Sequence, residues 1–407
     1  MSENYQSVVD AFRVSGSSPP NTRHAQTAVV RAGISSDVQH RAVIAPLYLT
    51  STFAFDGYGR KGSFDYTRSG NPTRSELAKA LATLEGGADA TVTSSGMSAI
   101  LLVLSLLRPG DLLVAPHDCY GGSYRLFSAL AERGSFDIDF VDQTDPTSFA
   151  RALKRRPKMV WVETPSNPLL RIVDLAAASR AAHEVGALLV ADNTFLSPAL
   201  QQPIRAGADV VVHSTTKYIN GHSDVVGGAT VAATAELGEK LAWWANCLGV
   251  TGSPFDSYLT LRGLRTLHAR FAVHEVNARA VVDVLAKHPA VLRVYHPSLT
   301  DHPGHAIARA QQKGFGAMVS FELKGGGDRV RAFVDGLSCF SLAESLGGVE
   351  SLIAHPASMT HASMDGAARE RAGISETLLR LSVGIEAPED LVSDLSAALE
   401  RARRVCG

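Results

Sequence analysis

One lysine stands where a buried strand is expected to end. Lys217 follows the apolar run Ala208–Val212, whose three consecutive valines favour extended backbone, and comes just after the hydroxyl residues Ser214 and Thr216. Burial disfavours the charged form of a lysine, so an amine in this position becomes a nucleophile of the kind that forms a Schiff base. The neighbouring hydroxyl groups could hold a phosphate. An ordinary loop lysine after a core strand is the alternative.

A carboxylate ends the preceding expected strand. Asp192 follows the apolar residues Val190 and Ala191, and burying it is costly unless a cation lies beside it. A pyridoxal phosphate site needs a carboxylate that keeps the pyridine nitrogen protonated and a lysine that holds the aldehyde carbon. Asp192 and Lys217 match that need, although a simple ion pair between them would satisfy the same residues.

A glycine turn precedes an expected helix at Ser95-Gly96-Met97. Glycine lets the backbone approach an anion, and the free N–H groups at the helix start would point to it. Helix capping alone is the alternative. The G-x-G-x-x-G run Gly57–Gly62 opens no helix within a strand–helix–strand unit, which argues against a dinucleotide-binding fold. The sequence also has no P-loop motif, which argues against a P-loop nucleotide-binding fold.

Three further side chains could contact a ring or a carboxylate. Tyr120 precedes two glycines and could lie flat against an aromatic ring. Arg125, near a helix start, and Arg380, within an apolar strand, are of the type that binds carboxylates through two N–H groups. Each residue also has a purely structural alternative. Tyr120 could be a core tyrosine, Arg125 a solvated helix arginine, and Arg380 a member of a structural ion pair.

The elements that would position these residues alternate between strand and helix. Strands are expected at 90–93, 112–115, 137–141, 159–162, 187–191 and 209–212, and helices at 75–85, 97–107, 123–133, 146–155 and 174–185. Apolar strands joined by helices are typical of a mainly parallel sheet buried on both faces, where ligands bind at the carboxyl ends of the strands. Most residues discussed above follow directly after such a strand.

The pattern changes after Pro254. One long helix, or a bent pair, is expected over 257–286, and a smaller α+β unit follows Pro297. Its expected strands are 317–323 and 378–383, and its expected helices 328–336 and 388–403. The chain is therefore divided into an N-terminal arm (1–65), a main domain (66–265) and a C-terminal domain (266–407).

Composition and charge argue against several classes of function. The 407 residues carry a net charge of −1, which gives no electrostatic hold on nucleic acid or an anionic membrane. Apolar runs fall well short of the ~20 residues that cross a bilayer, and no secretory signal is evident. Four scattered cysteines suit a reducing cytoplasm. Two histidine pairs, His302 with His305 and His355 with His361, lack further ligands, so no metal site is expected.

Six segments together resemble the Cys/Met-metabolism family of pyridoxal-phosphate enzymes, from about Thr27 to the end of the chain. They are Tyr66–Arg74, Ser95–Met97, Asp192–Thr194, Ser214–Tyr218, Glu344–Ser351 and Leu379–Glu386. The resemblance implies an α/β fold of the aspartate-aminotransferase type (fold type I), with the cofactor bound by residues 66–265. It also implies a homotetramer built from dimers that share active sites.

The resemblance also implies a role for each matched residue. Lys217 would form the Schiff base, Asp192 would pair with the pyridine nitrogen, and Tyr120 would stack on the ring. The phosphate would be held by Gly96, Met97, Ser214 and Thr216 and, from the neighbouring subunit, by Tyr66 and Arg68. The α-carboxylate of the amino-acid substrate would be bound by Arg380 and Asn167, and Ser345 would also contact the substrate. Its distal group and the incoming cysteine would be contacted by Asp65, Arg125 and Glu344.

Within the family, the segments Ala115–Arg125, Leu241–Asn246 and Gln311–Met318 are similar to bacterial members that join cysteine to O-succinylhomoserine. That reaction forms cystathionine and succinate in methionine biosynthesis. Sister enzymes that cleave cystathionine or methionine, or that use sulfide, share the cofactor residues and remain alternatives. A non-catalytic member that binds the cofactor only for structure is a further alternative.

Overall fold

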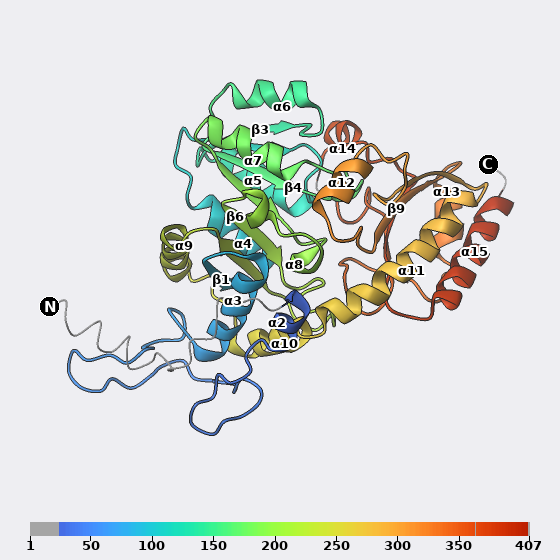
Figure 1. Ribbon diagram of the computed structural model, residues 1–407. Coiled ribbons are helices and arrows are strands. Elements are labelled where there is room, and N and C mark those ends of the chain that lie inside the picture. The colour runs from blue at the N-terminus through green and yellow to red at the C-terminus, as the bar shows by residue number, and fades with distance from the viewer. Residues whose placement is uncertain (1–23, 363, 406–407) are drawn as a thin grey trace.

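Two β-sheets organise the chain (Figure 1), and the computed structural model describes residues 24–362 and 364–405. The described part of the predicted N-terminal arm is residues 24–65. It begins with the short helix α2 (Ala25–Val30) and continues as loops that extend from the rest of the protein (Figure 1). The first part of that predicted arm, residues 1–23, lies outside the described residues.

The larger sheet has seven strands, β1 (Asp89–Thr93), β2 (Leu112–Pro116), β3 (Asp137–Val141), β4 (Met159–Glu163), β5 (Leu188–Asp192), β6 (Val210–Ser214) and β7 (Gly228–Ala232). Their order is β1-β7-β6-β5-β4-β2-β3, and only β7 runs antiparallel to its neighbours. Strand β7 is not among the strands predicted from the sequence, because three of its five residues are glycine or alanine, which have low strand propensity. Pairing with β1 on one side and β6 on the other makes this segment a strand.

The helices of this part are α3 (Pro72–Glu85), α4 (Gly96–Leu104), α5 (Gly121–Glu132), α6 (Pro146–Leu153), α7 (Leu175–Glu184), α8 (Ser197–Leu200) and α9 (Ala235–Leu248), with a 3₁₀ turn at Pro203–Ala206. Helix α4 was predicted to reach Leu107 but ends at Leu104. The N–H groups of Leu106 and Leu107 bond to carbonyls three residues back, so the last turn tightens out of the α-helix.

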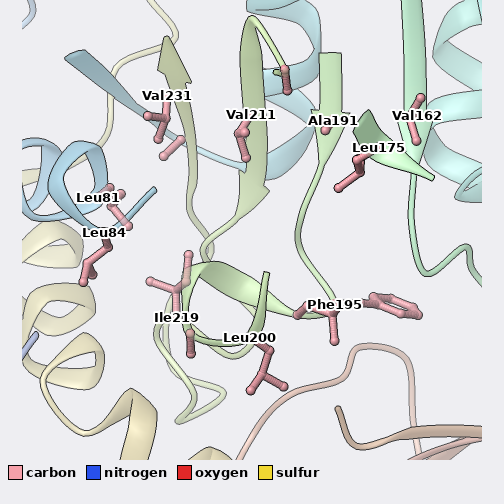
Figure 2. Packing of buried hydrophobic residues seen from close by; sticks show 14 of the residues in the cluster. Leu81, Leu84, Val162, Leu175, Ala191, Phe195, Leu200, Val211, Ile219 and Val231 are labelled. Atoms are coloured by element: carbon pink, nitrogen blue, oxygen red, sulfur yellow. The ribbon is translucent and has the colours of Figure 1, made fainter. Parts of the chain in front are cut away.

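Both faces of the large sheet are buried, because successive strand residues point to opposite sides. On one face Val162, Ala191, Val211 and Val231 pack with residues of α3, α7 and α8, as Figure 2 shows for Leu81, Leu84, Leu175 and Leu200. On the other face the alternate residues, among them Trp161, Val190 and Val212, pack with α4, α5 and α9. The sheet is thus a rigid support, and the carboxyl ends of its six parallel strands lie along one edge.

The predicted long helix is two helices, α10 (Pro254–Leu264) and α11 (Leu267–Lys287). Helix α11 leads to a second sheet of β8 (Val291–Tyr295), β9 (Met318–Leu323), β10 (Ser341–Leu342), β11 (Leu352–Ala354) and β12 (Leu378–Ser382), ordered β10-β11-β12-β9-β8. The remaining helices are α12 (His305–Gln311), α13 (Gly327–Val334), α14 (Gly366–Ala372) and α15 (Pro388–Arg404). Figure 1 shows α11, α13 and α15 along this smaller sheet. Among the described helices, none combines the length and apolar character that a membrane crossing requires.

Candidate active site

A cavity of about 770 Å³ lies where three neighbouring parallel strands end. Glu163, Asp192 and Ser214 are the last residues of β4, β5 and β6, and all three line it. The cavity collects the following residues predicted from the sequence: Gly96, Met97, Tyr120, Arg125, Asn167, Asp192, Ser214, Thr216, Lys217, Glu344, Ser345 and Arg380. The large sheet and the smaller one therefore both contribute to one site.

The amine of Lys217 lies in this cavity, just beyond the end of β6. Its Nζ donates to the hydroxyl Oγ of Ser345 at 2.7 Å. Burial, reinforced by the positive charge of Arg380 and opposed by Glu344, lowers the pKa of Lys217 to about 8. At pH 7 about a tenth of a lysine with this pKa is neutral, far more than for an ordinary lysine, and the neutral amine is the form that attacks an aldehyde.

Asp192 faces the cavity without a cationic partner. Its Oδ1 accepts from the backbone N–H of Thr194 at 3.0 Å, and among the described residues it forms no ion pair with Lys217 or any other cation. Burial raises the pKa of Asp192, while the hydrogen bonds from Thr194 oppose the rise. The alternative of a simple Asp192–Lys217 salt bridge is therefore wrong for this structure, and the carboxylate is placed to accept a cation from a ligand.

The start of α4 forms a close turn against the end of β6. A Cβ at Gly96 would lie 2.7 Å from the Cβ of Ser214, so only glycine allows this approach. Ser95 caps the helix by accepting from the N–H of Ser98, and the preceding N–H groups have no acceptor within the helix. The hydroxyl of Thr216, also predicted to hold a phosphate, here exchanges hydrogen bonds with the carbonyl and N–H of Gly227.

Tyr120 lies at the start of α5 with its ring against Gly122. A Cβ on Gly122 would lie 2.5 Å from that ring, so the glycine makes room for it. Burial raises the pKa of Tyr120, with Glu344 adding to the rise and Arg125 and Arg380 opposing it. Arg125, one turn along α5, is exposed and lines the same cavity. An aromatic face and a cation thus lie on the α5 side of the site.

Arg380, in the middle of β12, is buried and reaches the cavity from the smaller sheet. Its Nη1 donates to Oδ1 of Asn167 at 2.8 Å and its Nη2 to the carbonyl of Ser345 at 3.0 Å. Its Nε has no hydrogen-bond partner within residues 24–362 and 364–405. Burial lowers the pKa of Arg380 to about 10, so the group remains a cation at neutral pH. An unpartnered buried N–H beside a cavity suits a carboxylate ligand.

Three predicted residues, Asp65, Tyr66 and Arg68, do not line the cavity of their own chain. Arg68 donates through Nη1 to Oδ1 of Asn246 at 2.6 Å, and Asp65 accepts from the hydroxyl of Ser69 at 2.7 Å. They belong to the segment that leads from the predicted arm to α3.

The cavity also includes residues that the sequence analysis did not single out, Glu163, Thr194 and Thr360. Glu163 carries a signal that could have revealed it, because this carboxylate ends an apolar strand just as Asp192 does. Thr360 comes from the loop before α14, in a part of the smaller domain whose secondary structure the sequence analysis left undefined.

The chemistry of this donor set fits pyridoxal phosphate. A lysine of lowered pKa, a partly buried carboxylate with no ion pair among the described residues, a helix start whose first N–H groups have no acceptor within the helix, and an aromatic face line one cavity. They correspond to the aldehyde, the protonated ring nitrogen, the phosphate and the ring face of that cofactor.

The chain is similar to known proteins over almost its whole length. A family model described as "Cys/Met metabolism PLP-dependent enzyme" matches residues 26–400. The chain is 57% identical to cystathionine gamma-synthase of Escherichia coli (strain K12), over 94% of this chain and 100% of that protein. It is 45% identical to cystathionine gamma-lyase of Dictyostelium discoideum, over 94% and 99%. Crystal structures of cystathionine gamma synthase from Xanthomonas oryzae pv. oryzae, one with aminoacrylate and cysteine and one with cystathionine, superpose with a TM-score of 0.93. They are 64% identical to this chain, over 95% of it and 99% of theirs.

Proposed function

The chain belongs to the family of Cys/Met metabolism PLP-dependent enzymes, and we propose that it joins L-cysteine to O-succinyl-L-homoserine by γ-replacement, giving L-cystathionine and succinate. The cofactor is pyridoxal 5′-phosphate. The similarity to the Xanthomonas enzyme, whose crystals contain cysteine or cystathionine, is the observation that carries this proposal. The reaction belongs to the trans-sulfuration route of methionine biosynthesis.

Lys217 is the group that moves protons. When bound, the cofactor supplies an electron sink that acidifies the substrate carbons next to the amino group. Lys217 would hold the aldehyde carbon of the cofactor, and its Nζ, once free, would move protons at Cα and Cβ of the substrate. Ser345, which accepts from Nζ at 2.7 Å, keeps the amine directed into the cavity. Asp192 would keep the ring nitrogen of the bound cofactor protonated, and Tyr120 would lie against the ring.

Other residues bind the substrate and the phosphate. Arg380 and Asn167 hold the α-carboxylate of the substrate. One of its oxygens would accept a hydrogen bond from Nε of Arg380, which has no partner among the described residues. Arg125 binds the carboxylate of the succinyl group, and Asp65 and Glu344 help to position the distal group and the cysteine. Succinate leaves from Cγ, and the cysteine thiolate adds there. The phosphate is held by Gly96, Met97, Ser214 and Thr216.

The proposed assembly is a homotetramer made of two dimers that share active sites, in the cytoplasm. Asp65, Tyr66 and Arg68 lie off their own cavity, which supports a role in the neighbouring subunit's site. The proposed division of the chain is an arm over 1–65, a cofactor-binding domain over 66–265 and a C-terminal domain over 266–407.

The second candidate is a lyase that cleaves cystathionine, which the 45% identity to the Dictyostelium enzyme favours. The test measures initial rates on one preparation of holoenzyme with three substrate sets. These are O-succinylhomoserine with cysteine, O-succinylhomoserine with sulfide, and cystathionine alone. Cystathionine formation should be the fastest of the three. A faster cleavage of cystathionine would replace the proposal with the lyase, and a faster reaction with sulfide would replace it with a sulfhydrylase.

A further inference from the structure

Both carboxylate oxygens of Glu163 accept backbone N–H groups from two different loops. Oε2 accepts from Tyr120 at 2.9 Å and Oε1 from Asn167 at 2.9 Å. The first donor lies between β2 and α5, and the second lies in the loop that follows β4. Glu163 is only 5% exposed, so solvent cannot replace these acceptors at low cost.

The place of Glu163 in the sheet makes this arrangement costly. Glu163 is the register partner of Asp192 on the adjacent strand, and strands lie about 4.8 Å apart. Burial, followed by the negative charges of Asp192 and Asp118, raises the pKa of Glu163, and its two N–H donors oppose the rise. Among the described residues no cation forms an ion pair with it. A second carboxylate beside Asp192 therefore needs a reason other than ion pairing.

A carboxylate is the one side-chain group of this size that can accept from both loops. The amide of a glutamine has a single acceptor oxygen, and its NH₂ group would face the second N–H. The two loops carry Tyr120, whose ring faces the cavity, and Asn167, whose Oδ1 accepts from Arg380 at 2.8 Å. One side chain thus joins the ring-facing wall of the site to its carboxylate-binding end.

We propose that Glu163 is a positioning residue that fixes the backbone of Tyr120 and Asn167 in one geometry, so that the ring-stacking and carboxylate-binding groups act on the same bound molecule. The inference rests on the proposed function only for the roles of those two residues. The link between the loops is independent of which thiol or ester the enzyme prefers.

The test compares Glu163→Gln and Glu163→Asp with a matched control, Glu275→Gln. Glu275 on α11 also accepts two backbone N–H groups, from Phe315 at 2.7 Å and Gly316 at 3.1 Å, but both reach its single oxygen Oε1, and it does not line the cavity. A glutamine amide can keep both of these bonds, so this variant controls for loss of a partly buried negative charge alone. Amide hydrogen exchange is followed by mass spectrometry in peptides covering residues 117–124 and 164–169. Pyridoxal phosphate affinity, kcat and KM are measured on the same samples.

Glu163→Gln should speed exchange in at least one of these peptides by about tenfold or more, since a buried hydrogen bond is lost. It should also weaken cofactor binding and raise KM for the amino-acid substrate, while the visible absorption of the bound cofactor is retained. Glu275→Gln should change none of these. Unchanged exchange in both peptides for Glu163→Gln would overturn the inference.

The Glu163→Asp variant distinguishes the effect of the carboxylate's position from the effect of its charge. It also provides the test if the glutamine variant does not fold. It keeps the charge but is one methylene shorter, so it should hold at most one loop and speed exchange in the other. Exchange and KM at wild-type values in this variant would show that only charge matters and would overturn the inference. Exchange and cofactor affinity need no turnover, so they stand apart from any failure of the proposed reaction.

Discussion

The guanidinium of Arg380 on β12 donates to Oδ1 of Asn167 at 2.8 Å, joining the smaller sheet to the loop that follows β4 of the larger one. The same guanidinium donates to the carbonyl of Ser345, whose hydroxyl accepts from Lys217. The proposed carboxylate-binding group and the proposed proton-moving amine are therefore connected through one residue. Docking of the two sheets determines the geometry of the site.

Arg380→Lys should lower kcat/KM mainly through KM. Lysine keeps the charge but loses the planar set of N–H donors that holds Asn167, Ser345 and a carboxylate together. Hydrogen bonds to charged groups contribute about 1.5–3 kcal/mol, so the loss should be roughly 10- to 100-fold. Steady-state kinetics checks this, with the exposed Arg180→Lys on α7 as control. Wild-type kinetics for Arg380→Lys would contradict the assigned role.

The cofactor-free protein should capture pyridoxal phosphate faster as the pH rises, with the rate levelling off above about 8. The neutral amine of Lys217 is the reactive form, and its pKa is lowered to about 8. An unperturbed lysine, with a pKa of about 10.4, would keep gaining rate to much higher pH. Borohydride trapping followed by peptide mapping gives the rate at Lys217. The Lys217→Ala variant should show no trapped adduct in the peptide that contains residue 217, and no turnover. Activity in that variant would contradict the mechanism.

Asp192→Asn should weaken cofactor binding yet stabilise the cofactor-free protein at pH 8. The folded-state pKa of Asp192 is raised, so the fold is most stable when this group is protonated and loses stability as the pH rises through the folded pKa. Removing the charge should raise Tm by roughly 1–4 °C at pH 8. The gain should shrink as the pH falls through the raised folded-state pKa, because the carboxyl group is then neutral as well. Thermal unfolding and absorbance titration with cofactor measure both effects, and the exposed Asp301→Asn serves as control.

Arg125→Ala should impair the O-succinyl ester more than the O-acetyl ester of homoserine. Only the succinyl group carries a second carboxylate for this exposed arginine at the cavity. The difference in kcat/KM should be about tenfold, as expected for one charge-assisted hydrogen bond. Arg133→Ala, at the other end of α5, is the control. Equal losses with the two esters would remove Arg125 from substrate choice.

Strand positions in the larger sheet could be predicted from the sequence because buried parallel strands are continuous apolar runs. The prediction of 137–141 coincides with β3, and the others differ from the observed strands by one or two residues at one or both ends. Strand β7 could not be predicted, because its glycine and alanine residues carry no strand signal of their own. Of its two partners, β6 precedes it along the chain, but β1 (Asp89–Thr93) lies more than a hundred residues away.

The sequence by itself determined the types of the chemical groups and their places at strand ends: Lys217 after one apolar run, Asp192 after another, and a glycine turn at Gly96. Resemblance of these motifs to a known family also determined the cofactor. Only the tertiary structure decided which groups meet. Sheet order brings β4, β5 and β6 together and so adds Glu163 beside Asp192, and docking of the smaller sheet brings Arg380 to Asn167. Local propensity acts over a few residues, whereas these contacts join residues more than a hundred positions apart or depend on strand register.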